Sequence, residues 1–206
     1  MCGRYLIDDE AFDLREILEA AEKNIQSMNV ETASPVWQKT GSIEVFPGTY
    51  APVIDANHEA VFMLWGFPNI MTGNQPHINA RSETASVKRT FSGAMASRRC
   101  LVPASGYYEW KATGKRYKDK YEFKLPENTT MYMAGIYSQD GRYAILTRAA
   151  SPSIADIHDR MPVILPEPYR NIWLNETPEV IHEALTELHH QLAPGVNQPQ
   201  QLSMFS

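Results

Sequence analysis

Cys2 is the residue whose type and position offer the most distinctive chemistry in the sequence. Cysteine is small enough for the initiator methionine, Met1, to be trimmed, and trimming leaves an amine and a thiol on adjacent carbons. Such a 1,2-aminothiol traps aldehydes, because the amine condenses to a Schiff base and the thiol closes a stable five-membered thiazolidine. The α-amino group has a reference pKa of about 8, so a useful fraction is nucleophilic near neutral pH. A lone cysteine is more often a small buried hydrophobe, and its place beside the terminus is what favours the chemical role.

Three further side chains have the chemistry that Schiff-base formation requires. His158 can exchange protons near neutral pH, and Glu109 can act as an acid or a base beside the amine. Asn79 carries an amide that could orient an aldehyde oxygen or the amine. Each also has a structural explanation: Glu109 could pair with an arginine, His158 could be a hydrogen-bonded loop residue and Asn79 could cap a turn. The residues alone favour these structural explanations.

Charge is distributed unevenly along the chain, whose formal net charge is -5. Residues 81–120 hold ten basic and three acidic side chains, a net charge of +7, and the remaining residues hold nine basic and twenty-one acidic ones, a net charge of -12. Charge alone is best explained by a solvated surface. Bases stack on aromatic faces while cations follow phosphates, and aromatic residues occur in or beside the basic window: Phe91, Tyr107, Tyr108, Trp110, Tyr117 and Tyr121. The combination favours single-stranded nucleic acid as a partner.

Short strands are the predicted elements that must position these residues. Strand-like runs at 2–7, 43–46, 50–54, 60–65, 100–103, 107–110, 121–125, 131–137 and 143–147 are separated by turn signals that favour hairpins over parallel βαβ units. One amphipathic helix is predicted from about Phe12 to Ile25, and another after Thr177, with Pro178 in its first position. We therefore expect one α+β domain, residues 1–193, with a strongly bent, barrel-like, mainly antiparallel sheet and flanking helices. Residues 194–206 are predicted to be a disordered tail because they are rich in Gln and Pro.

Composition excludes several classes of protein. The acidic Asp8, Asp9 and Glu10 stand where a secretory signal would be apolar, and the longest apolar run, residues 60–67, is too short to span a bilayer. Two cysteines, Cys2 and Cys100, form no disulfide framework, so we expect a cytoplasmic location. The six histidines are scattered without metal-ligand spacing. We expect neither a metal nor another cofactor, and no membrane partner.

Four stretches of the sequence resemble the SRAP (SOS response-associated peptidase) family. They are MCGRY at 1–5, NARSET at 79–84, RCLVPASGYYEW at 99–110 and HDRMP at 158–162, with weaker matches at 47–49 and 65–66. Each motif alone is unspecific, but their order, combined with a cysteine at position two, is specific. The resemblance covers the chain from residue 2 to about residue 165.

The resemblance implies a function in the response to DNA damage. An abasic deoxyribose exposes an aldehyde when its ring opens, and the family resemblance implies that Cys2 bonds covalently to such sites in single-stranded DNA. It also favours catalytic roles for Asn79, Glu109 and His158, and implies that Glu109 helps to reverse the bond. The implied activity is that of a thiol enzyme with lyase-like Schiff-base chemistry, and autoproteolytic or peptidase activity stays open. Such a protein would work near the nucleoid.

DNA contacts are expected from two groups of residues inside or beside the motifs. Arginine forks match phosphate oxygens, which favours three residues: Arg4, Arg81 and Arg160. Three others are expected to stack on, or wedge beside, exposed bases: Pro47, Trp65 and Trp110. Trp65 could equally belong to the core. Two departures from the family pattern concern the DNA groove: the stretch between Trp65 and Asn79 is short, and Arg148 stands where the family often has a small polar residue.

Two other functions remain as alternatives. A peptidase or amidohydrolase would use Cys2 as an N-terminal nucleophile and would need an oxyanion hole, which a sequence cannot reveal. A non-catalytic single-strand binding module would need the basic and aromatic surface but not Cys2.

The segment Gln201-Leu202-Ser203-Met204-Phe205 resembles the short peptide by which bacterial replication and repair proteins dock on the sliding clamp. It departs from the usual pattern by Met204 in place of leucine. The Gln201 amide would fix the register, while Leu202, Met204 and Phe205 would be apolar anchors. The alternatives are a chance match and a segment that folds back on the domain.

Overall fold

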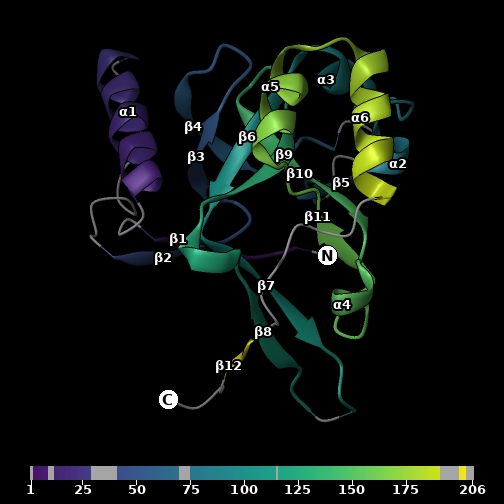
Figure 1. Cartoon of the computed structure of the whole chain (residues 1–206). Helices are drawn as coiled ribbons and strands as arrows, with labels where there is room; N and C mark the ends of the chain where they lie inside the picture. The colour runs from purple at the N-terminus through teal and green to yellow at the C-terminus, as the bar shows by residue number, and fades with distance from the viewer. Residues whose placement is uncertain are drawn as a thin grey trace.

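The computed structural model describes residues 2–8, 12–28, 41–69, 75–114, 116–190 and 200–202 of the chain. Their strands form two sheets, of which one closes into a small barrel and the other carries a hairpin that projects away from it (Figure 1). Helices lie along the outer sides of the barrel.

Five strands close the barrel. They are β3 (Tyr50–Ile54), β4 (Ala60–Trp65), β6 (Arg99–Ala104), β9 (Met131–Tyr137) and β10 (Arg142–Ala149). The strand order is β10-β4-β3-β6-β9, and β9 pairs again with β10, so the ring has no free edge. All of these pairings are antiparallel except that of β10 with β4. The barrel pairings are therefore mainly antiparallel, and two of them, β3–β4 and β9–β10, are the hairpins that turn signals predict.

Glycine in β9 allows the barrel strands to approach each other closely. A Cβ atom at Gly135 would lie 2.7 Å from Cys100 Sγ and 2.9 Å from Val102 Cγ2. Both distances are too short for any side chain at position 135, which explains the glycine there. Cys100 is fully buried and packs in the barrel core as a small hydrophobic residue.

Two short strands extend the barrel at β10 and carry predicted site residues. β5 (Asn79–Arg81) runs parallel to β10, and β11 (Arg160–Pro162) runs antiparallel to it. Thr147 of β10 is paired with Arg81 on one side and with Pro162 on the other. The NARSET and HDRMP motifs therefore flank the same end of one barrel strand.

The second sheet has the order β12-β8-β7-β1-β2, and all of its pairings are antiparallel. Its strands are β1 (Tyr5–Asp8), β2 (Ser42–Val45), β7 (Gly106–Lys111), β8 (Asp119–Phe123) and β12 (Gln200–Leu202). β6 runs almost directly into β7, and the Ser105 amide between them donates to the Leu6 carbonyl at 2.8 Å. This connection holds the second sheet against the barrel.

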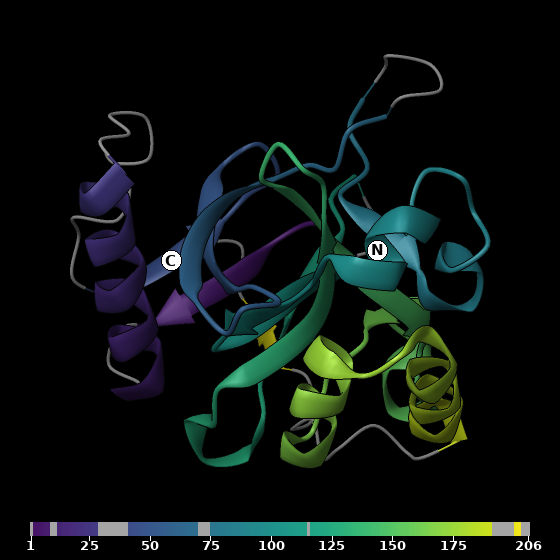
Figure 2. The same ribbon diagram turned by 90° about the horizontal axis from the view of Figure 1, so that it is seen from above.

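Helices cover two opposite sides of the barrel, as the view from above shows (Figure 2). α1 (Phe12–Met28) packs on β3 and β4 through a stripe that includes the buried Leu14 and Ala21. On the other side, α3 (Ser92–Ser97) and α5 (Glu167–Asn175) lie against β6, and α6 (Pro178–His190) packs on α5. Three single turns complete the described helices: α2 (Ser82–Ala85), α4 (Pro152–Ala155) and the 3₁₀ helix η1 (Pro126–Asn128).

The predicted fold class is confirmed: this is an α+β domain with a closed, mainly antiparallel barrel and flanking helices. The tail prediction is wrong for residues 200–202, because they form β12 and pair with residues 120–122 of β8. Residues 194–199 and 203–206 of the predicted tail lie outside the described residues. Among the described residues, no helix combines the length and the apolar composition needed to cross a bilayer.

Candidate active site around Cys2

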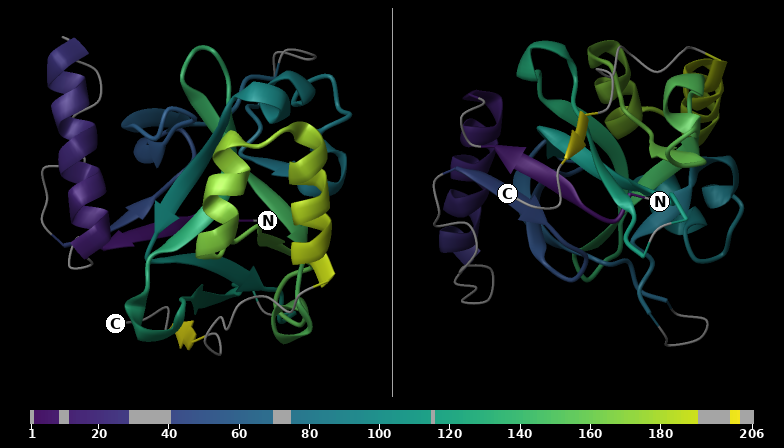
Figure 3. Two further views of the ribbon diagram at one scale, coloured as in Figure 1. Left: turned by 45° about the horizontal axis from the view of Figure 1, so that its top comes forward. Right: turned by 90° about the horizontal axis from the view of Figure 1, so that it is seen from below.

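Cys2 is held where the second sheet meets β5 of the barrel side. The Asn79 side-chain amide donates from Nδ2 to the Cys2 carbonyl oxygen at 2.8 Å. Two residues on, the Arg4 carbonyl accepts the Tyr108 amide at 3.0 Å, which places the start of the chain along β7. Figure 3 shows this start running between the hairpin of the second sheet and the end of the barrel. The Cys2 side chain is completely buried there.

The Cys2 thiol is a protonated group in this environment. Burial raises the pKa of the thiol well above its ordinary value, and the nearby Glu109 carboxylate raises it further. The thiol donates to the Arg4 carbonyl at 3.9 Å, and a backbone hydrogen bond with Arg4 opposes part of the rise in its pKa. A thiol of this kind is a weak nucleophile until a base removes its proton.

Glu109 is the nearby carboxylate that is suited to remove the thiol proton. It lies on β7 with only 2% of its surface exposed, and burial raises the pKa of its carboxyl group, an effect that His158 partly opposes. Its Oε2 atom lies 3.9 Å from His158 Nε2. A carboxyl group with a raised pKa in a buried site is suited to accept and return protons near neutral pH.

His158 follows the short helix α4 and faces Glu109 through one ring nitrogen. The Arg160 amide lies 3.0 Å from His158 Nδ1, and Asp159 Oδ1 lies 2.9 Å from the same atom. In a neutral ring the first contact requires Nδ1 to accept and the second requires it to donate. We assign the acceptor role, because the amide is fixed by the backbone whereas the Asp159 side chain is 82% exposed. Nε2 then carries the proton and points it toward Glu109.

Asn79 completes the set of predicted catalytic residues. Its Nδ2 atom is bonded to Cys2, while its Oδ1 atom is buried and accepts no hydrogen bond from the described part of the chain. An unused acceptor next to the Cys2 backbone is suited to hold an amine or a carbinolamine hydroxyl. The structure thus brings all four predicted catalytic residues together: Cys2, Asn79, Glu109 and His158.

Arg4 lies on the opposite face of the second sheet from Glu109. Its guanidinium is 4.3 Å from the centroid of the Phe46 ring and 5.0 Å from that of Trp110, and it pairs with Glu44 at 3.2 Å. Phe46 is 41% exposed and precedes the exposed Pro47. Stacked cationic and aromatic groups of this kind can bind phosphates and bases. We call Arg4, Phe46, Pro47 and Trp110 the aromatic platform.

Phe46 was missed at the sequence level. It ends a strand-like run, and its hydrophobicity favours a core position in that context. Its exposure follows from the strand register, because Val45 is the neighbour that points into the core, with 1% of its surface exposed. The feature of the sequence that could have indicated an exposed Phe46 is its place before the Pro47-Gly48 turn.

The other two predicted phosphate ligands lie beside the barrel and differ from each other. Arg81 is exposed at the end of β5, and no hydrogen bond or ion pair is found for its side chain within the described ranges. Arg160 pairs with both carboxylate oxygens of Glu83, at 2.7 and 2.8 Å, and also donates to the Thr147 carbonyl at 2.6 Å. Arg81 is therefore available to a phosphate, whereas Arg160 is engaged in holding α2 to the barrel.

Trp65 does not belong to the surface, so the prediction that it stacks on exposed bases is wrong. It is completely buried, its Nε1 atom donates to the Ile78 carbonyl at 2.9 Å, and its ring packs on Tyr5 and Tyr143. Its alternative role in the core is the one that the structure supports.

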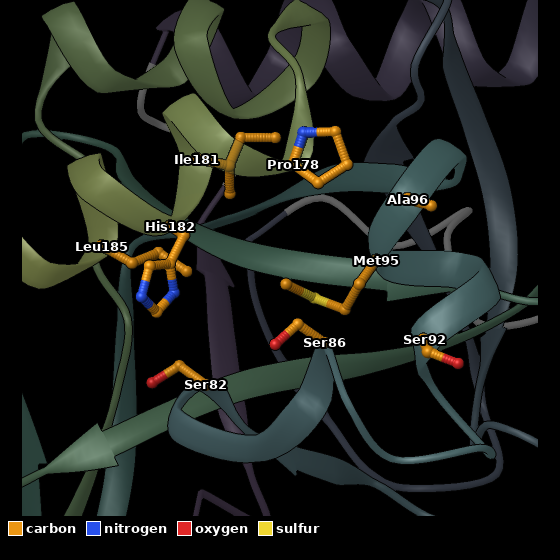
Figure 4. A pocket seen from close by; sticks show the side chains of 9 residues that line it. All are labelled: Ser82, Ser86, Ser92, Met95, Ala96, Pro178, Ile181, His182 and Leu185. Carbon is orange, nitrogen blue, oxygen red and sulfur yellow. The ribbon is translucent and has the colours of Figure 1, made fainter.

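A separate cavity of about 110 Å³ lies between α2, α3 and α6. Figure 4 shows Met95 and Ile181 beside it, with the polar ends of Ser82 and His182 at one side. None of the four predicted catalytic residues lines it. Nor do His, Cys, Asp and Glu side chains of the described residues form a group of three or more that could hold a metal ion.

Comparison with known proteins gives one consistent family. The model of the family described as "SOS response associated peptidase (SRAP)" matches residues 1–200. "Abasic site processing protein YoqW" of Bacillus subtilis is 30% identical over 190 residues, covering 85% of this chain and 80% of the relative. "Abasic site processing protein YedK" of Escherichia coli is 28% identical over 187 residues, with the same coverage of 85% and 80%.

Solved structures show the same fold. A phage-related protein of Bordetella bronchiseptica superposes with a TM-score of 0.70 at 22% identity, over 98% of this chain and 95% of the other. A protein from Bacteroides thetaiotaomicron gives a TM-score of 0.66 at 21% identity, over 89% and 86%. With the family match over nearly the whole chain and the motif residues gathered at one site, the chain belongs to the SOS response associated peptidase (SRAP) family.

Proposed function

We propose that the protein recognises abasic sites in single-stranded DNA and forms a covalent thiazolidine crosslink through Cys2 after Met1 is removed. The observation that carries this proposal is the cluster around Cys2, in which Asn79 holds the Cys2 backbone while the buried Glu109 and the partly exposed His158 provide proton-transfer groups. The names of the relatives, which are abasic site processing proteins, support the same substrate. The crosslink would shield the lesion from strand cleavage during the SOS response, on the chromosome in the cytoplasm.

The proposed reaction has two covalent steps. The amine of Cys2 attacks the aldehyde carbon of the open abasic sugar, and loss of water from the carbinolamine gives the Schiff base. The thiol then adds to the imine carbon and closes the ring. His158 and Glu109 move the protons of both steps, and Asn79 orients the amine through its Oδ1 atom. The reverse sequence, with Glu109 as the proton donor, would reopen the ring, hydrolyse the Schiff base with one water molecule and release the intact abasic strand.

The DNA strand is proposed to pass over the end of the second sheet, where Cys2 lies. On one side it would meet Arg81 at the end of β5, and on the other the aromatic platform. Arg160 would contribute indirectly, because its pair with Glu83 holds α2 near the DNA strand. This path places cationic groups on both sides of the reacting aldehyde.

The test is a comparison of oligonucleotides that differ only by one abasic site. The wild-type protein should give a band that survives denaturation without reductant, because ring closure removes the reducible imine. Cys2→Ala should lose this band while its terminal amine still forms a Schiff base that borohydride captures. Equal reductant-free crosslinking by Cys2→Ala would rule out the thiazolidine.

A thiol peptidase is less well supported by the site. A cysteine nucleophile for amide hydrolysis needs a lowered pKa, supplied by a cation or a helix N-terminus. Cys2 is in the opposite situation, because burial and Glu109 both raise its pKa. An aminothiol trap tolerates this, since the amine attacks first and the thiol follows within the same molecule. A purely binding module would leave the cluster of Asn79, Glu109 and His158 without a use.

We also propose that the C-terminal segment docks on a sliding clamp. Gln201 and Leu202 lie in β12, paired with Tyr121 and Lys120 of β8, while Met204 and Phe205 lie outside the described residues. The fold-back alternative therefore holds for the backbone of residues 200–202, and docking requires β12 to leave β8. The test is a titration of the host clamp with the C-terminal peptide and with a Leu202→Ala, Phe205→Ala double variant. Equal affinity for the two peptides would end the proposal.

A further inference from the structure

Tyr107 is a buried residue of β7 whose hydroxyl has no role in the mechanism above. Its side chain is completely buried, and its ring stacks on Phe123 with the centroids 4.8 Å apart and the planes 10° from parallel. The hydroxyl oxygen finds no hydrogen-bond partner among the described residues. A phenylalanine would make the same ring contacts without leaving a buried polar group unsatisfied. The hydroxyl therefore calls for an explanation beyond packing.

The hydroxyl belongs to the same buried cluster as Cys2 and interacts electrostatically with Cys2 and Glu109. Tyr107 precedes Glu109 by two residues on β7, so both side chains leave the same face of the strand. Tyr107 and Cys2 belong to the same buried cluster, and Tyr5, near the start of the chain, is paired directly opposite Tyr107. Burial raises the pKa of the Tyr107 hydroxyl well above its ordinary value, and negative charge on Cys2 or Glu109 raises it further. The hydroxyl therefore stays protonated. Toward an anionic Cys2 or Glu109 it acts as a hydrogen-bond donor.

Neighbouring tyrosines show that the site can satisfy such groups. The hydroxyls of Tyr5 and Tyr143 bond to each other at 2.7 Å, and that of Tyr108 donates to Glu122 at 3.3 Å. Each of these three has a partner in the resting protein, whereas Tyr107 has none in the described part of the chain. An unpaired donor in the same buried cluster as the thiol is suited to stabilise that thiol in its ionised form.

We propose that the Tyr107 hydroxyl donates a hydrogen bond to the sulfur of Cys2 while the thiol closes the thiazolidine ring. In this step Glu109 takes the proton from the thiol, the sulfur forms a bond to the imine carbon, and the C=N π pair moves to the nitrogen. The nitrogen then receives the proton from Glu109, so that S–H and C=N become S–C and N–H. Negative charge develops on a buried sulfur during the transfer, and a preorganised donor stabilises it. The inference rests on the proposed function, because it assigns Tyr107 to its second covalent step.

The test is the Tyr107→Phe variant of the full chain with an abasic oligonucleotide. Borohydride trapping measures Schiff-base formation, and the denaturation-resistant product without reductant measures ring closure. Since a hydrogen bond to a charged group is stronger than one between neutral groups, we expect ring closure to slow by about tenfold, while Schiff-base formation and affinity for intact single strands change by less than about twofold. The melting temperature should stay the same or rise, because an unsatisfied buried hydroxyl is removed.

Tyr143→Phe is the matched control. It also removes one buried tyrosine hydroxyl, but it breaks the bond to Tyr5 and leaves the Tyr5 hydroxyl unpaired. Its melting temperature should fall, whereas its ring closure should stay within about twofold of the wild type at temperatures where it is folded.

An unchanged closure rate in Tyr107→Phe overturns the inference alone. Equal losses in closure, Schiff-base formation and DNA affinity, with a lower melting temperature, also overturn it, because they show a structural role. A wild-type protein that forms no covalent product overturns the proposed function and this inference together.

Discussion

At the residue scale, Glu109 combines a proposed chemical role with a cost in stability. Burial raises its pKa above the ordinary value of 4.5, so its charged form is less favourable in the folded protein than in the unfolded chain. Because the folded pKa is the higher one, the contribution of Glu109 to stability is complete below about pH 4.5 and is lost as the pH rises through the folded value. A neutral isostere should escape this loss.

We therefore predict that Glu109→Gln raises the melting temperature at pH 7 and slows crosslink formation. Each kcal/mol gained should add roughly 2–4 °C for a chain of this size, and the gain should shrink toward pH 4. Thermal melts at pH 4, 5.5 and 7 measure the first effect, and the exposed Glu19→Gln on α1 is the control with no expected change. The quantity to compare is the melting temperature of the variant minus that of the wild type at each pH. If this difference is smaller at pH 7 than at pH 4, burial is not the main cause of the raised pKa of Glu109.

At the element scale, one buried arginine joins the helices on the β6 side of the barrel. Arg99 at the start of β6 is 4% exposed and donates to the last carbonyls of two helices. Nη1 reaches Met95 and Ala96 in α3 at 2.7 and 2.8 Å, and Nε and Nη2 reach Trp173 and Glu176 at the end of α5 at 2.6 and 2.8 Å. A planar group with five N–H donors is needed to satisfy carbonyls on both helices at once.

Arg99→Lys should destabilise the protein by about 2–3 kcal/mol, because one ammonium group cannot reach both helix ends and buried carbonyls lose their partners. Arg98→Lys is the matched control, since within the described residues the Arg98 side chain makes one hydrogen bond, from Nε to the Tyr137 carbonyl at 3.2 Å. Urea unfolding of the two variants measures the difference. Equal losses in both would mean that the charge at position 99, and not its fork geometry, stabilises these helices.

Elements with a strong apolar pattern were predictable from the sequence, and short ones were not. The runs at 50–54, 60–65 and 131–137 coincide with β3, β4 and β9, because apolar residues, many of them β-branched or aromatic, fill almost every position. β5 and β11 have three residues each, too few for any periodicity, and they exist because β10 offers them pairing partners. The short α2, α3 and α4 were missed for the same reason.

The site was predictable where chemistry selects the residue and not where exposure decides. Cys2, Asn79, Glu109 and His158 carry functional groups that motif order singles out, and they lie together. Trp65 has an indole that suits both a base and a core, and only the packing against Tyr5 and Tyr143 decides for the core. The pairing of Arg160 with Glu83 joins residues 77 positions apart, which no local pattern indicates.

At the scale of the whole molecule, the proposed DNA binding depends on a basic region within an acidic chain. The net charge is -5, while residues 81–120 carry +7, so cations must act locally against a repelling background. Repulsion between exposed charges is screened over about 10 Å at 0.1 M salt. Affinity for single strands should therefore fall with rising salt in proportion to the number of phosphates that are neutralised. Arg81 and Arg160 should differ in how much each contributes to this salt dependence.

We predict that Arg81→Ala weakens binding to abasic and intact single strands alike and lowers the slope of log affinity against log salt by about 1, as expected when one phosphate contact is lost. Arg160→Ala should change the slope less, because Glu83 already neutralises its guanidinium through two contacts at 2.7 and 2.8 Å. Removing it should instead lower the melting temperature, since α2 and Thr147 lose their link. The measurement is a fluorescence titration of an intact oligonucleotide across a salt series with each variant. Identical slopes for Arg81→Ala and wild type would remove Arg81 from the interface, and a larger change in slope for Arg160→Ala than for Arg81→Ala would show that DNA displaces Glu83 from Arg160.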